Sequence, residues 1–239
     1  MFTRTENFRT FLSLYPIVSL IVCIHLVFWF LFQLPIPAIQ LFLGLLDGYN
    51  AGIANGEYWR LITPIFLHMT FSHLFFNTIS LILFAPALER MLKKVKFILI
   101  YCISGIIANI ATYLIEPLNY SHLGASGAIF GLFGVYLFIV YFRKGLIDQA
   151  NSQVIISILV IGVIMTFFNS NTNVVAHLFG LFGGFLIAPL FVKKSGRFVH
   201  QTYYSPQSRS FSINKFKAKH IAWMIFGILI LIGVLVQFN

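Results

Sequence analysis

The sequence predicts an all-α integral membrane protein, and three observations carry that prediction. Of the 239 residues, 59% are hydrophobic and only 9% are charged, and the mean hydropathy is +0.90. This composition excludes an ordinary soluble domain. Apolar runs of about 20 residues, the length that a helix needs to cross a bilayer, recur along the chain. The basic residues are confined to alternate connections between these runs.

Seven apolar runs are candidate membrane-spanning helices. They cover residues 12–34, 65–87, 96–115, 124–142, 153–168, 174–192 and 220–238. The connection 36–60 is too apolar for a solvated loop, so we expect it to lie in the outer interfacial layer. A loop packed on the protein itself is an equally good interpretation. Residues 193–219 form a basic linker before the last run, and residues 1–239 make one polytopic membrane domain.

The placement of charge predicts the orientation of the chain. The formal net charge is +10, yet every Lys and Arg except Arg60 falls on one side of the membrane in a single topology. By the positive-inside rule the N-terminus is cytoplasmic and the C-terminus, after seven spans, is outside. This pattern predicts the lipid bilayer, and no nucleic acid, as a partner. The many Phe, Ile, Asn and Lys residues favour a bacterial source and hence the bacterial cell membrane.

Polar residues interrupt three of the spans that run inward. The second span carries His68, His73 and Asn77, the fourth begins with Ser126, and the sixth begins with His177. A polar group in hydrocarbon costs roughly a few kcal/mol unless it is paired or hydrated, which marks these residues as a candidate functional site. Given the predicted directions, all of them fall between the outer surface and the membrane midplane.

Ser126 and His177 together predict nucleophilic catalysis. A serine hydroxyl becomes a nucleophile when a nearby base takes its proton, and neutral histidine suits that task. Glycines at a spacing of four let two membrane helices approach closely, and both spans carry such pairs. These glycines are Gly127, Gly131, Gly180 and Gly184. No Asp or Glu lies in either span, so the sequence predicts a dyad without an acidic third member.

His73 and Asn77 are candidate donors to an oxyanion. They lie four residues apart, hence on one face of a helix, and the backbone N–H of Ser126 could join them. His68 would lie about 140° around the same helix from His73, so we expect it to have a structural part. That separation also disfavours a two-histidine metal site, and no His-Glu-x-x-His motif occurs. The sequence therefore predicts neither a metal nor another cofactor.

Taken together, these residues resemble the rhomboid family of intramembrane serine proteases. The resemblance extends over about residues 55–190 and follows the family's order of spans. It is carried by Gly124-Ala125-Ser126-Gly127, by Ala176-His177 with Gly180 and Gly184, by His68, His73 and Asn77, and by Glu57-Tyr58-Trp59-Arg60.

The resemblance implies a rhomboid-like six-helix catalytic core over residues 12–192, with residues 220–238 as one extra C-terminal transmembrane helix. It implies that Ser126 is the nucleophile, that His177 is the general base, and that His73, Asn77 and the Ser126 N–H form the oxyanion hole. The expected substrates are transmembrane proteins, cut within or next to the membrane.

Other residues are expected to support this site. The resemblance implies that Trp59 and Arg60 support the loop 36–60, and we expect Glu57 to brace it with Arg60. Gly124 precedes the nucleophile. His25 is expected to be structural or interfacial, and for His122 a contact with substrate or a gating part is the less favoured alternative to a structural one. In place of the tyrosine that some members stack on the catalytic histidine, this chain has Phe130, whose ring can stack there too.

Two other classes compete with a protease. A transporter would use broken helices and charged midplane sites, yet these spans contain essentially no charge and no evident inverted repeat. A non-catalytic rhomboid-like protein that binds membrane clients is the stronger alternative. Ser126→Ala separates the two, because it should abolish a protease's function and spare a client-binding protein.

Overall fold

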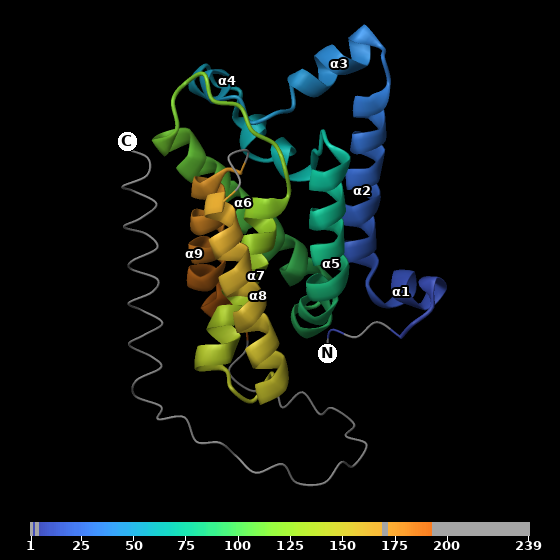
Figure 1. Ribbon diagram of the computed structural model, residues 1–239, viewed down its shortest axis with the longest axis vertical. Helices are drawn as coiled ribbons and strands as arrows, with labels where there is room; N and C mark the ends of the chain where they lie inside the picture. The colour runs from blue at the N-terminus through green and yellow to red at the C-terminus, as the bar shows by residue number, and fades with distance from the viewer. Residues whose placement is uncertain (1, 3–4, 169–171, 193–239) are drawn as a thin grey trace. The chain divides into compact units, whose positions relative to one another are not determined.

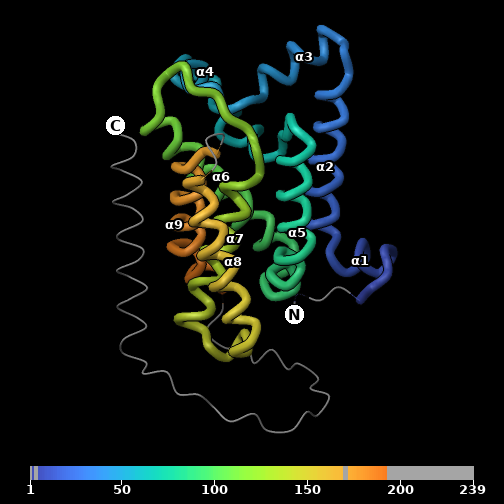
Figure 2. The backbone as a smooth tube through the Cα atoms, in the orientation of Figure 1, coloured from blue at the N-terminus to red at the C-terminus, as the bar shows by residue number. Residues whose placement is uncertain are grey.

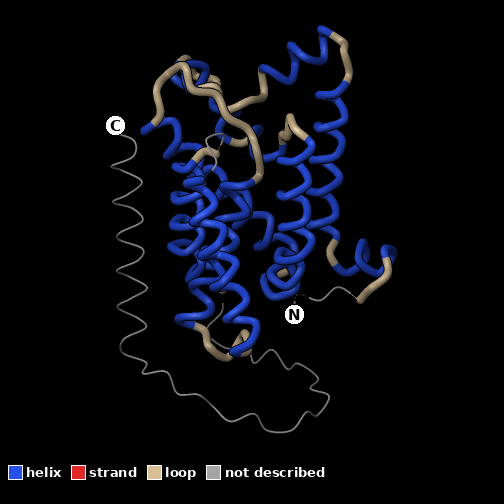
Figure 3. The backbone as a smooth tube through the Cα atoms, viewed as in Figure 1, coloured by secondary structure: helices blue, strands red, loops and turns tan. Residues whose placement is uncertain are grey.

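The computed structural model describes residues 2, 5–168 and 172–192, and every regular element in those residues is a helix (Figure 3). The predicted all-α class is therefore confirmed. The predicted linker 193–219 and the predicted seventh span 220–238 lie outside the described residues.

Six long helices account for the six predicted spans among the described residues (Figure 1). They are α2 (Pro16–Gln33), α5 (Phe71–Leu92), α6 (Lys94–Ile115), α7 (Ser126–Phe142), α8 (Gln149–Phe168) and α9 (Val174–Phe191). Five of them are long and apolar enough to cross a membrane, and α7 is a shorter apolar helix. The shorter elements are α1 (Phe8–Leu14), α3 (Pro37–Gly44), α4 (Asn50–Ala54) and the 3₁₀ turns η1 (Tyr58–Leu61) and η2 (Thr63–Phe66).

Helix α5 begins later than the predicted span 65–87 because a side chain caps it. The Oγ1 atom of Thr70 accepts a hydrogen bond from the backbone N–H of His73 at 3.4 Å, which fixes Thr70 as the N-cap. His68 consequently lies before the helix rather than in it. The helical angle of about 140° between His68 and His73, on which the sequence-based argument relied, was therefore wrong.

Helices α7 and α9 pack against each other more extensively than any other pair, and α6 packs on both (Figure 1). The predicted glycines make this contact possible. A Cβ atom at Gly180 would overlap the carbonyl group of Gly127, and a Cβ at Gly184 would overlap the carbonyl of Gly131. The two backbones therefore touch with no side chain between them.

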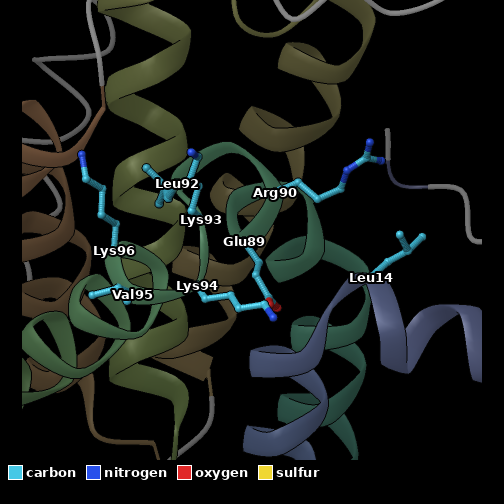
Figure 4. Close-up of a pocket in the computed structure, with 8 residues that line it drawn as sticks. All are labelled: Leu14, Glu89, Arg90, Leu92, Lys93, Lys94, Val95 and Lys96. Atoms are coloured by element: carbon cyan, nitrogen blue, oxygen red, sulfur yellow. The ribbon is translucent and has the colours of Figure 1, made fainter.

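A buried carboxylate joins α2 to α5. The two oxygens of Glu89 accept hydrogen bonds from the backbone N–H groups of Ile17 and Val18 at 3.0 and 2.9 Å. These donors belong to the first turn of α2, where no helical partner exists. In Figure 4 Glu89 lies close to Arg90, Lys93 and Lys94, where α5 ends and α6 begins. The sequence did not single out Glu89, which lies beyond the predicted end of its span.

The connection between α2 and α5 is organised around the guanidinium group of Arg60. Arg60 is buried, with 4% of its surface exposed. Arg60 forms ion pairs with Asp47 and with Glu57, both at 2.5 Å, and donates to the carbonyl of Gly44 at 3.0 Å. The indole N–H of Trp59 donates to the carbonyl of Leu45 at 2.9 Å. These contacts agree with the expectation that Arg60 and Glu57 brace the loop.

The segment between α6 and α7 is tied to this loop, as Figure 2 shows where it passes α4 and reaches the start of α7. The backbone N–H of Gly48 donates to the carbonyl of His122 at 2.8 Å, and that of Asn50 donates to Tyr120 at 3.0 Å. The N–H of Gly124 donates to the carbonyl of Pro64 at 2.9 Å. The start of α7 is thus held by backbone bonds to a braced loop.

The glycine contact predicts a selective loss of stability. Gly184→Ala should lower the free energy of unfolding by about 1–3 kcal/mol, because its methyl group would overlap the facing backbone. Gly162→Ala on α8 is the matched control, since its Cβ would meet only the Phe130 ring at an ordinary 3.5 Å. Thermal unfolding in mild detergent measures both. Equal transition temperatures for the two variants would contradict the close contact of α7 and α9.

Candidate active site

Ser126 is the first residue of α7, and the backbone before it has an unusual conformation. Gly124 has φ of +136°, a region that favours glycine, and a Cβ there would overlap the imidazole of His73. Ala125 occupies the N-cap position and contributes no side-chain hydrogen bond. The first N–H groups of a helix have no helical acceptor and lie at the positive end of its dipole. The backbone at Ser126 is therefore suited to stabilise a negative charge.

His177 lies in the first turn of α9, which is fixed by its cap. The side chain of Asn173 accepts a hydrogen bond from the N–H of Ala176 at 2.8 Å. Ala176 in turn packs on α7, because its carbonyl lies 3.4 Å from the place where Gly127 would carry a Cβ. Ser126 and His177 are the chain neighbours of these two contacting residues, so the structure brings them to the same crossing.

Both Ser126 and His177 are half-buried. Among the described residues, no hydrogen bond joins the Ser126 hydroxyl to the His177 imidazole. In enzymes without substrate, catalytic hydrogen bonds are often long and shorten when the substrate binds. The resting structure thus presents the two groups at one crossing without the bond that proton transfer would use.

The imidazole of His177 is held from two directions. The ring of Phe130 stacks on it with centroids 4.2 Å apart and planes 16° apart, which confirms that phenylalanine can take this position. The Nδ1 atom lies 2.8 Å from the hydroxyl oxygen of Thr166 on α8. Thr166 does not stand out in the sequence, since no motif distinguishes it from other hydroxyl residues in apolar helices.

The amide of Asn77 is engaged in the resting structure. Its Nδ2 atom donates to the carbonyl of His73 at 3.0 Å and lies 3.1 Å from Nε2 of His68. An amide nitrogen only donates, so Nε2 of His68 is the acceptor. His68 thus lies against both His73 and Asn77, the pair whose helix face it was expected not to share, and its ring is 5.0 Å from that of His73. Both N–H bonds of the amide are therefore occupied.

A further histidine lies behind this group. His25 on α2 is fully buried, and its ring centroid is 4.5 Å from that of His68. Its Nε2 atom is 3.4 Å from the hydroxyl of Tyr101 on α6. The expectation that His25 is structural agrees with this position in a second layer, where it supports His68 rather than facing Ser126.

His122, which precedes the Ser126 motif, faces into the protein. Its Nε2 atom lies 3.1 Å from the side-chain oxygen of Asn109, whose amide nitrogen donates to the carbonyl of Leu61 at 2.9 Å. Burial lowers the pKa of His122 to about 4. A ring that is neutral and bonded in this way suits a structural part, in which it holds the loop before α7.

Comparison with known proteins gives a consistent result. The family model described as the Rhomboid domain matches residues 55–194. YdcA of Bacillus subtilis (strain 168), which carries the name of a candidate rhomboid protease, is 59% identical over 197 residues, or 82% of this chain and 99% of YdcA. The rhomboid protease GluP of the same organism is 41% identical over 150 residues, or 62% of this chain and 29% of GluP. Rhomboid-like protease 1 of Toxoplasma gondii is 28% identical over 193 residues, covering 75% of this chain and 66% of that protein.

The burial of His122 predicts a pH-dependent stability. Its pKa of about 4 in the fold lies below the ordinary 6.5. Between these values the unfolded chain binds more protons than the folded one, so the free energy of unfolding should fall as the pH falls from 6.5 toward 4. In thermal unfolding at pH 7 and pH 5, the transition temperature of the wild type should drop more than that of His122→Gln. Equal drops in transition temperature for the two proteins would show that His122 does not contribute to the pH dependence of stability.

Proposed function

The chain belongs to the rhomboid family, and we propose that it is an intramembrane serine protease that cleaves transmembrane proteins with a Ser126–His177 dyad. The observation that carries this proposal is the contact of Gly127 with Ala176, which brings a serine and a histidine to one helix crossing. The family and the multi-pass helical fold favour substrates that lie in the bilayer.

In the proposed reaction the Ser126 hydroxyl attacks the scissile carbonyl carbon of the substrate. The hydroxyl proton passes to Nε2 of His177, which later gives it to the leaving amine. Water then attacks the acyl-enzyme, and the same imidazole takes one proton from that water. When the second tetrahedral intermediate collapses, the proton returns to the Ser126 oxygen, which leaves Ser126 and His177 as they began.

Three groups are the proposed donors to the oxyanion: the backbone N–H of Ser126, His73 and Asn77. Support for the first comes from the start of α7, which no side chain caps. Asn77 would have to turn one N–H away from the carbonyl of His73. The carbonyl of His73 would still have a hydrogen-bond donor after this rotation, because it also accepts the backbone N–H of the residue four positions later in the helix.

The proposed orientation places the N-terminus in the cytoplasm of a bacterial cell. Its support is the distribution of Lys and Arg in the sequence, which concentrates them on one side. In this orientation Ser126 and His177 lie in the outer half of the membrane, and the loop around Arg60 lies at its outer surface.

The dyad is tested most simply without a known substrate. A fluorescent fluorophosphonate should label the purified wild type in mild detergent, because His177 activates Ser126, and should not label folded Ser126→Ala or His177→Ala. Ser104→Ala removes a buried hydroxyl that donates to the carbonyl of Ile100 in its own helix, so its labelling should match the wild type. If folded wild type labels no better than Ser126→Ala, client binding without catalysis becomes the better account.

The oxyanion role of Asn77 predicts a kinetic defect. Asn77→Ala should slow labelling by about 100-fold to 1,000-fold, the usual effect of losing one oxyanion donor. Labelling rates at several probe concentrations measure the change. Asn151→Ala, near the start of α8, provides a control that should keep the wild-type rate. A folded Asn77→Ala protein with the wild-type rate would remove this residue from the oxyanion hole.

A further inference from the structure

We propose that Thr166 is a positioning residue that holds His177 in the tautomer with its proton on Nδ1 and a bare Nε2. The proposal rests on the proposed dyad, since only a bare Nε2 can take the proton of Ser126. It gives the hydroxyl of Thr166 the orienting task that a carboxylate performs in a triad, in a site where neither helix α7 nor helix α9 carries an acidic residue.

The hydrogen bonds of Thr166 determine the tautomer. A hydroxyl has one proton to donate and two lone pairs that accept. The Thr166 hydroxyl donates to the carbonyl of Gly162 at 2.9 Å, one turn earlier in α8. Its oxygen is 2.8 Å from Nδ1 of His177 and has no second proton to give. It must therefore accept from Nδ1, and the proton of the neutral imidazole lies there.

The surroundings keep this hydroxyl in place. Thr166 is 3% exposed, so water does not compete for its oxygen. Its branched side chain has few rotamers in a helix, and the bond to Gly162 selects one that faces α9. A Cβ added at Gly162 would lie 3.5 Å from the Phe130 ring, so α8 comes close to the aromatic face that covers His177. One turn of α8 thus fixes both the position of the His177 imidazole and its tautomer.

The same bond suits both protonation states of the imidazole. When Nε2 takes the Ser126 proton, Nδ1 keeps its own proton and continues to donate to Thr166. No proton passes to Thr166, and its bond to Gly162 does not have to change. An uncharged acceptor also avoids the cost of burying a carboxylate between apolar helices.

The test compares Thr166→Val, which keeps the shape and removes the hydroxyl, with Thr166→Ser, which keeps the hydroxyl. Labelling by the fluorophosphonate is followed at several concentrations, so that binding and the bond-forming rate separate. Thr166→Val should lower the bond-forming rate at least about 10-fold, as expected when general-base catalysis is impaired, with probe binding unchanged. Thr166→Ser should restore most of the rate. Thr78→Val on α5, whose hydroxyl is buried without a partner among the described residues, is the control for the substitution itself.

A second readout does not depend on activity. In protein labelled with ¹⁵N-histidine, the nitrogen shifts of His177, assigned by their loss in His177→Ala, report which nitrogen carries the proton. The wild type should show Nδ1–H, and Thr166→Val should show a mixture of tautomers. A folded Thr166→Val protein with the wild-type bond-forming rate and wild-type nitrogen shifts would overturn the proposal. So would a bond-forming rate in Thr166→Ser that is as low as the rate in Thr166→Val. If the wild type shows Nδ1–H but no labelling at all, the proposed dyad fails while the tautomer assignment stands.

Discussion

The close contact of α7 with α9 is the constraint on which the rest of the site depends. Where Gly127 faces Gly180 and Gly131 faces Gly184, the two backbones meet without intervening side chains. This contact sets the separation of Ser126, the first residue of α7, from His177 in the first turn of α9. A single methyl group at the contact would push α7 and α9 apart, and Ser126 would move away from His177. The geometry of the site is thus a consequence of backbone packing more than of any polar bond.

The polar groups around this contact are arranged in layers. Phe130 and Thr166 hold the imidazole of His177, while His68 and His25 stand behind Asn77. These side chains come from α2, α7, α8 and the segment before α5, so the packing of those elements is what brings the polar groups into reach. In hydrocarbon such groups are costly unless they are paired, which explains why most of them bond one another.

Much of this arrangement could be predicted from the sequence, because the relevant signals are local. Hydropathy predicts the spans, the glycine spacing predicts the approach of α7 and α9, and Ser126 and His177 stand out as polar residues at helix starts. His68 could not be placed correctly, since the N-cap at Thr70 makes Phe71 the first residue of α5 and leaves His68 outside the helix. The partners of buried groups were also beyond reach. Thr166 reaches His177, and Glu89 reaches the start of α2, only through tertiary packing. No periodicity of the sequence predicts either pair.

The measurement that most directly tests the central claim is the site of covalent attachment of a fluorophosphonate to the full chain. Intact-mass analysis followed by peptide mapping identifies the modified residue and counts the adducts in each chain. We expect one adduct, on Ser126, because the contact of Gly127 with Ala176 brings this serine and His177 to one helix crossing, where the proposed dyad would activate it. An adduct on a different residue, or a folded chain that forms none, would contradict the account.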